Sequence, residues 1–157
     1  MRGLIVQGSA RLDGDTASVT KVLAQKSGWE VVSLKALNIG SFDYEHQQKN
    51  DDFLPLMRRF VQECELLCLA TPIYWYTMSW LLKNNLDRFT DLLTIDKDLG
   101  RQLRGKSMAL LSVNHEPIPN PHFTTPVELS AEYLGMPYRG HVHANMYKGI
   151  TPIVHRT

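Results

Sequence analysis

Five short apolar runs divide the chain, and the segments between them are mostly polar with apolar residues at helical spacing. The runs are residues 3–7 (GLIVQ), 30–34 (EVVSL), 66–70 (LLCLA), 108–113 (MALLSV) and the weaker 137–144 (PYRGHVHA). Each run is nearly continuous in apolar residues, which is typical of strands that are covered on both faces. We therefore predict five β-strands at these positions.

Helices are predicted in the intervening segments. In residues 16–27 the apolar positions Val19, Val22 and Leu23 fall on one helical face. Similar faces mark three further segments, residues 54–61, 78–93 and 127–135. The alternation of strand and helix predicts one doubly wound α/β domain over residues 1–157, with a parallel sheet and right-handed crossovers. Ligands of such sheets bind outside the carboxyl ends of the strands. The loops after the first, third and fourth strands therefore form the candidate site.

The first of these loops, residues 8–16 (GSARLDGDT), has small and hydroxylated residues just before a predicted helix. Backbone N–H groups at a helix N-terminus are unpaired and favour an anion. Ser9 and Thr16 supply hydroxyl donors and Arg11 a guanidinium, which predicts a phosphate site. Asp15 does not suit a phosphate neighbour. The alternative is a capped helix start without a ligand, in which Asp15 or Thr16 is the N-cap.

The second loop, residues 70–80 (ATPIYWYTMSW), contains three consecutive aromatic residues, Tyr74, Trp75 and Tyr76. Consecutive side chains at a strand end cannot all face the core, so some must lie on the surface or against a flat ligand. The alternative is a contact between subunits, and the two interpretations are compatible because a ligand can lie at a dimer interface.

Three motifs in these positions resemble the flavodoxin-like NAD(P)H-dependent FMN reductases. They are G-S-x-R-x-x-G-x-T after the first strand, T-P-x-Y-W after the third, and L-x-x-x-L-D-R-F in the next helix. The matching residues are Gly8, Ser9, Arg11, Gly14 and Thr16, then Thr71, Pro72, Tyr74 and Trp75, then Leu82, Leu86, Asp87, Arg88 and Phe89. The predicted order of elements agrees with the family over essentially the whole chain.

The resemblance implies a flavodoxin-like three-layer sandwich, in which a five-stranded parallel sheet of order 2-1-3-4-5 carries helices on both faces. It also implies bound FMN. The residues that would hold the phosphate are Ser9, Arg11, Asp15, Thr16 and Ala17, and those that would line the ribityl chain and the ring are Pro72, Ile73, Tyr74, Trp75 and Tyr76. Ser112, Asn114 and His115 would contact the flavin from the third loop.

The chain departs from the family pattern at several positions. Asp15 stands where the family often has an amide, and Ala10 stands where it often has proline. The loop after the fourth strand reads SVNHEPIPNPH, whereas the family usually has glycines there. Residues 40–52 contain no cysteine, so we expect no iron–sulfur cluster.

The function that the resemblance implies is electron transfer from NADH or NADPH. Hydride passes to flavin N5 and the electrons then pass to a quinone, a free flavin or a similar small acceptor, without a catalytic side chain. A homodimer or homotetramer is expected. The alternative is a flavodoxin that carries electrons without nicotinamide-dependent activity. Flavodoxins are strongly acidic, whereas this chain has a formal net charge of +1. A receiver domain of the same fold would need an acidic pocket, which the strand ends do not supply.

Composition limits the remaining function classes. A net charge of +1 gives no strong field for nucleic acid or for a membrane surface. No secretory signal or membrane-spanning run is apparent, so we expect a cytoplasmic protein. Cys64 and Cys68 are too few and wrongly spaced for a redox or zinc motif, which predicts apolar packing.

One motif points elsewhere: residues 100–107 (GRQLRGKS) fit the phosphate-loop pattern G-x-x-x-x-G-K-[ST]. A working phosphate loop follows a strand and opens a helix. This stretch follows a helix and precedes a strand, so we interpret it as a turn, with Lys106 as a solvated side chain at the far end of the sheet.

The remaining polar clusters are weaker candidates. His141 and His143 alternate along the last strand and share a face, but with no third ligand at a telling spacing a metal site is not expected. His115 and His122 flank the third loop and are possible substrate contacts. Three acidic residues before the second helix are interpreted as helix-start charges, namely Glu45, Asp51 and Asp52.

Overall fold

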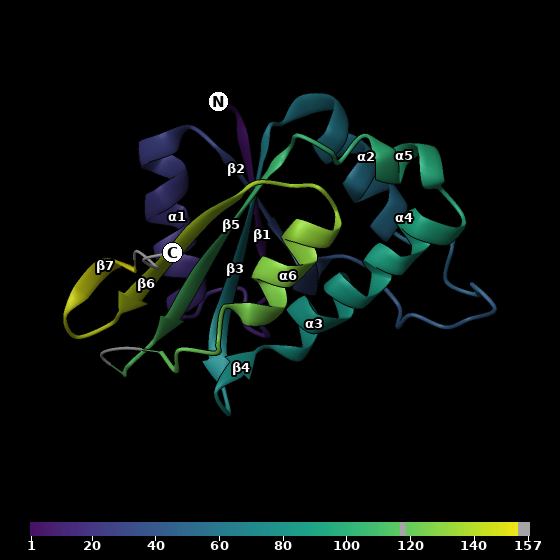
Figure 1. The fold of residues 1–157 in the computed structure, drawn as a ribbon. Helices are drawn as coiled ribbons and strands as arrows, with labels where there is room; N and C mark the ends of the chain where they lie inside the picture. The colour runs from purple at the N-terminus through teal and green to yellow at the C-terminus, as the bar shows by residue number, and fades with distance from the viewer. Residues whose placement is uncertain (117–118, 154–157) are drawn as a thin grey trace.

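The computed structural model describes residues 1–116 and 119–153, which form a twisted sheet between helices (Figure 1). The parallel strands are β1 (Gly3–Gln7), β2 (Glu30–Ser33), β3 (Leu66–Tyr74), β5 (Ser107–Asn114) and β6 (Tyr138–Asn145). They are ordered β2-β1-β3-β5-β6. Because β5 and β6 are the fourth and fifth predicted strands, the predicted order 2-1-3-4-5 is confirmed.

Two antiparallel strands were not predicted. β4 (Thr77–Met78) folds back on the end of β3, and β7 (Gly149–Ile153) pairs with β6 along the sheet edge. A two-residue strand is too short to leave a hydrophobic pattern. β7 contains a glycine and Pro152, and proline is tolerated in strands mainly at sheet edges.

The helices match the predicted segments except in one region. α1 (Asp15–Ser27), α2 (Phe53–Glu63) and α6 (Thr125–Tyr133) lie where the periodicity placed them. The predicted helix over residues 78–93 is instead divided into α3 (Trp80–Asp87), the 3-10 turn η2 (Arg88–Thr90) and α4 (Asp91–Thr94). Two short elements were missed, η1 (Leu34–Ala36) and α5 (Lys97–Arg101). The division falls at Arg88, a buried side chain that bonds both to Asp91 in α4 and to the distant segment of residues 40–51.

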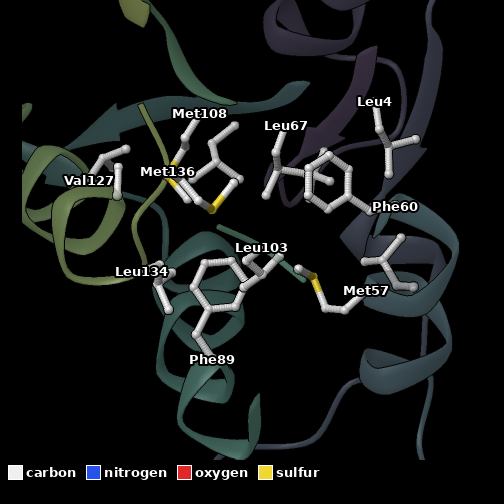
Figure 2. Close-up of a cluster of buried hydrophobic side chains, with 14 of the residues drawn as sticks. Leu4, Met57, Phe60, Leu67, Phe89, Leu103, Met108, Val127, Leu134 and Met136 are labelled. Atoms are coloured by element: carbon white, nitrogen blue, oxygen red, sulfur yellow. The ribbon is translucent and has the colours of Figure 1, made fainter. Parts of the chain in front are cut away.

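The two faces of the sheet are covered unequally. α1 lies on one side, and the helices from α2 to α6 lie on the other (Figure 1). The larger core is on the second side, where aromatic, leucine and methionine side chains interlock, among them Phe60, Phe89, Leu103 and Met108 (Figure 2). On the α1 side a hollow of about 940 Å³ remains between α1 and β6. Helices on both faces confirm the predicted three-layer sandwich.

Two further expectations concern the core and the membrane. Cys64 and Cys68 are buried and unpaired. Burial raises the pKa of the Cys68 thiol to about 12, so it stays protonated and packs as an apolar group. No helix in the described part of the chain has the length and apolar character to span a bilayer.

Candidate functional site

The three predicted loops meet at the carboxyl ends of β1, β3 and β5. The N–H of Gly8 donates to the carbonyl of Ala70 at 2.7 Å, and the Ser79 hydroxyl donates to the carbonyl of Gly8. These bonds join the first loop to the segment that follows β3. After β5, the imidazole Nε2 of His115 lies 3.2 Å from the Asp15 carboxylate in the first turn of α1. The first loop is thus in direct contact with both of the others.

The first turn of α1 is open. Gly14 is the N-cap, and no side chain caps the helix, so the alternative with Asp15 or Thr16 as N-cap is wrong. Within the described residues, the N–H groups of Asp15, Thr16 and Ala17 donate to no protein acceptor. Unpaired N–H groups at the positive end of a 13-residue helix form a suitable cradle for a phosphate.

Side chains around this turn differ in exposure. Ser9 and Thr16 are buried, and the Ser9 hydroxyl accepts the N–H of Arg11 at 3.2 Å, which fixes the bend of the loop. Arg11 is exposed and forms no ion pair with any residue that the structure describes. Its guanidinium is therefore available to an anion on the helix N-terminus.

The second loop is a tight hairpin with an aromatic tip. Tyr74 pairs with Thr77, so Trp75 and Tyr76 are the two central residues of the turn, with φ angles of 48° and 66°. Asn and Gly favour this left-handed region, and bulky side chains rarely adopt it. Trp75 is 92% exposed and Tyr76 is 74% exposed. The prediction that the aromatic residues cannot all face the core is confirmed. Pro72 and Ile73 are half-buried just before the tip.

The third loop, which follows β5, is held by hydrogen bonds within itself and to the β6–β7 turn. The Asn114 side chain accepts the N–H of Glu116 at 2.7 Å, and its carbonyl accepts the N–H of Met146 in the β6–β7 turn at 3.1 Å. The His115 ring stands 4.9 Å from the ring of Tyr147. His115 thus lies between Tyr147 and Asp15 of the first loop, a pairing with Asp15 that the sequence did not predict. His122, the other candidate, is exposed before α6.

The structure corrects the prediction for the side chain of Ser112. Its side chain is fully buried, with its hydroxyl 2.7 Å from His141 Nε2 and 2.8 Å from His143 Nδ1. The predicted contact between Ser112 and the flavin is therefore replaced by a contact with two imidazoles inside the protein. Alternate residues of β5 face opposite sides of the sheet. Ser112 lies on the same side as Leu110, which belongs to the larger core, so its side chain points into the protein.

Two residues that the sequence analysis did not assign to the site hold the third loop. His143 Nε2 lies 2.9 Å from the Glu116 carbonyl. The Asn145 amide donates to the carbonyls of His115 and Glu116 at 3.1 and 2.7 Å. Both side chains are buried. The sequence signal that could have identified them is the spacing of His141, His143 and Asn145. These three polar residues share one face of a strand whose other face is apolar.

The acidic residues before α2 take part in a second buried cluster. Arg88 is 1% exposed and bonds to Asp51, to Asp91 and to the carbonyls of Gly40 and Gln48. Burial lowers the pKa of the Arg88 guanidinium, but the bonds to the two carboxylates outweigh that effect and the net pKa is raised. Arg88 is therefore charged at any physiological pH.

The helix-start interpretation of the neighbouring acids is correct only in part. Asp51 accepts the N–H of Phe53 at 2.9 Å at the start of α2, but it is also a partner of Arg88. Asp52 accepts the N–H of Asn38 at 2.7 Å. Glu45 is exposed.

The phosphate-loop pattern is excluded by its position. Residues 100–107 run from the end of α5 through a turn into β5, at the amino end of that strand and opposite the candidate site. Lys106 is half-buried and donates to the carbonyl of Cys64 at 2.6 Å. The expectation of a solvated lysine is wrong, because the side chain folds back over the end of α2.

Among residues 1–116 and 119–153, no group of three or more metal-binding side chains is placed to hold an ion. His141 and His143 do share a face, as predicted, and they lie on either side of the Ser112 hydroxyl.

Comparisons with known proteins point to one family. The sequence matches the family described as NADPH-dependent FMN reductase over residues 1–117. The Bacillus subtilis protein YwqN, whose name describes an NAD(P)H-dependent FMN-containing oxidoreductase, is 27% identical over 152 residues, which cover 90% of this chain and 83% of YwqN. An NADPH azoreductase of a Bacillus species is 28% identical over 87 residues, which are 55% of this chain and 49% of the azoreductase.

A solved structure shows the same fold. The Trp repressor binding protein from Bacillus subtilis superimposes with a TM-score of 0.72 at 24% identity, covering 92% of this chain and 83% of that protein. The resemblance that the loops indicated is confirmed, together with FMN as cofactor and a nicotinamide nucleotide as electron donor. The chain belongs to the NADPH-dependent FMN reductase family.

Proposed function

We propose that FMN binds across the three loops, with its phosphate on the first turn of α1 and its ring against the hairpin of Tyr74, Trp75 and Tyr76. The observation that carries this proposal is the open helix start, where three consecutive N–H groups have no protein acceptor in the described chain. Arg11, which forms no ion pair with a described residue, lies beside them and would bind the same anion. When bound, FMN takes electrons from a reduced nicotinamide nucleotide and passes them to an acceptor.

The hairpin supports the proposed position of the ring. Two adjacent bulky residues in the left-handed region are costly and persist only where surrounding groups hold them. Their side chains are largely exposed, so a flat ligand or a second subunit is the group that would hold them. No side chain is assigned a catalytic role, because the chain is needed only to bind and orient the reactants and to exclude water.

The acceptor that we propose is a small conjugated molecule, such as a quinone, a free flavin or an azo compound. The partial match to an azoreductase is consistent with this class. The near-neutral charge of the chain supports an enzyme over a dedicated electron carrier, since carriers use strong charge to attract protein partners.

We further propose that the protein is cytoplasmic and forms homodimers or homotetramers. Exposed aromatic side chains of the hairpin and of neighbouring segments support a subunit contact, namely Tyr44, Tyr74, Trp75, Tyr76 and Trp80. The free, buried cysteines are consistent with a reducing compartment. Light scattering of the parent and of Trp80→Ser tests the contact, and a parent that is monomeric at all concentrations contradicts it.

Titration calorimetry of the apo protein with FMN and with FAD tests the binding mode. We expect one FMN per chain and weaker binding of FAD, because the first loop offers an open turn for one phosphate. Absence of FMN binding at high micromolar concentration would contradict the proposal.

Oxidation of NADH or NADPH by the loaded protein, with a quinone as acceptor, separates the enzyme from the flavodoxin alternative. We expect loss of nicotinamide absorbance with at least one of the two donors. A protein that binds FMN but is reduced by neither donor within minutes is a carrier.

A further inference from the structure

The third loop of this chain has no glycine between β5 and Phe123, although it lies at the cofactor site. Its course at residues 114–116 is fixed by side chains of β6 that lie beneath it. The carbonyl of Glu116 accepts two bonds, one from the Asn145 amide at 2.7 Å and one with His143 Nε2 at 2.9 Å. We call His143 and Asn145 the loop clamp.

The hydrogen-bond chemistry of the loop clamp has one consistent arrangement. A carbonyl only accepts, so His143 Nε2 must carry a proton. In the neutral ring Nδ1 then accepts the Ser112 hydroxyl proton at 2.8 Å. The Asn145 amide is oriented in the same way: its NH₂ group faces two carbonyls, and its oxygen accepts the N–H groups of Tyr147 and Lys148 at 2.8 Å each. All four hydrogen-bonding positions of Asn145 are therefore occupied.

The clamped loop places His115 beside Asp15. The imidazole lies 3.2 Å from the carboxylate, and both side chains are about half exposed. Asp15 is in the first turn of α1, where an unbalanced carboxylate would repel a phosphate on the same N-terminus. When it is protonated, His115 is the group that offsets this charge.

We propose that His143 and Asn145 are positioning residues of the cofactor site, because they hold residues 114–116 in the course that brings His115 to Asp15. The inference rests on the proposed position of the FMN phosphate. Its electrostatic step makes a distinct prediction: the clamp matters for FMN only while Asp15 carries a negative charge.

Two substitutions of His143 separate the effect of its hydrogen bond to the loop from the effect of burying its side chain. His143→Asn retains a group near the Ser112 hydroxyl and loses the reach to Glu116, whereas His143→Gln places an amide N–H where Nε2 was. Asn145→Asp keeps the shape and the acceptor for the β6–β7 turn but presents an oxygen to two carbonyls. We expect His143→Asn and Asn145→Asp to weaken FMN binding about tenfold, and His143→Gln to stay within about threefold of the parent.

Two measurements complete the test: FMN affinity by calorimetry, and amide hydrogen exchange of residues 115–116 without FMN. The two damaging variants should exchange faster there, and in an Asp15→Asn background their loss of FMN affinity should shrink below about threefold. Equal losses in His143→Asn and His143→Gln would overturn the proposal, and so would an unchanged loss in the Asp15→Asn background.

The same design distinguishes failure of the two proposals. If the parent binds no FMN, the proposed function fails, and the exchange measurement still decides whether the clamp holds the loop. If the parent binds FMN and the clamp variants bind it equally well, only the inference about the clamp is wrong.

Discussion

Two irregular segments of this protein, residues 38–52 and residues 114–116, are each held by buried side chains that bond to backbone carbonyls, and the two arrangements differ in charge. Arg88 holds the first segment with a guanidinium whose donors all have partners, two carbonyls and two carboxylates. The loop clamp, His143 and Asn145, holds the second segment with groups that are uncharged when His143 is neutral.

The difference shows what each arrangement contributes. A buried charge stripped of one partner is strongly destabilising, so Arg88, Asp51 and Asp91 commit the first segment to one structure. A neutral clamp also fixes the course of the backbone, but the loss of one partner leaves no buried charge unpaired. It is the neutral arrangement that lies next to the proposed phosphate site, where another fixed charge would compete with the ligand.

The largest expected effect comes from breaking the charged arrangement. Arg88→Met leaves two buried carboxylates without their counter-charge and should lower the free energy of unfolding by about 3–5 kcal/mol. Urea denaturation of the apo protein measures it. Arg101→Met is the matched control, because its partner Asp98 is exposed and the pair should contribute less than about 1 kcal/mol. Similar losses in both variants would show that burial does not set the contribution of Arg88.

The first loop sharpens the comparison because its cation, Arg11, bonds to no carbonyl of the described residues. Arg11→Ala should leave stability unchanged and weaken FMN binding by tenfold to a hundredfold, roughly 1.5–3 kcal/mol. Calorimetry and thermal unfolding measure the two quantities, with Lys21→Ala on the exposed surface of α1 as a control for net charge. An Arg11→Ala protein that binds FMN like the parent means that N–H groups and hydroxyls alone hold the phosphate.

A smaller effect is expected when the neutral arrangement is broken at Ser112, the residue that bonds to His143 on the side of the ring away from the loop. Ser112→Ala removes the hydroxyl between His141 and His143 and should lower the free energy of unfolding by about 1–2 kcal/mol. Because the bond between His143 Nε2 and the Glu116 carbonyl remains, FMN affinity should stay within about threefold of the parent. A larger loss of affinity with unchanged stability would restore Ser112 to the flavin site.

The smallest effect is expected at a half-buried cation. Lys106→Ala removes one bond to the Cys64 carbonyl and should cost about 1 kcal/mol in stability. Magnesium-ATP should not raise the melting temperature of the parent, whereas FMN should, by mass action on the folded state. A melting shift with ATP that Lys106→Ala abolishes would mean that residues 100–107 bind nucleotide.

Much of the fold could be predicted because its signals are local. The apolar runs predicted the five parallel strands, since a covered parallel strand must be apolar on both faces. Their order in the sheet followed from the family resemblance. The glycines and hydroxyls of residues 8–16 and the consecutive aromatic residues after β3 marked two walls of the candidate site. These features depend on neighbours within a few residues, which is the range that periodicity and turn chemistry report.

Tertiary structure alone decided which polar groups meet. The helix expected over residues 78–93 breaks at Arg88, whose partner Asp51 lies 37 residues away in sequence. Ser112 turns from the ligand edge to two histidines 29 and 31 residues later. His115 and Asp15, 100 residues apart, come together only because strand order places β1 and β5 on either side of β3. A sequence pattern encodes whether a side chain is buried, but its hydrogen-bond partner is set by the packing of distant segments.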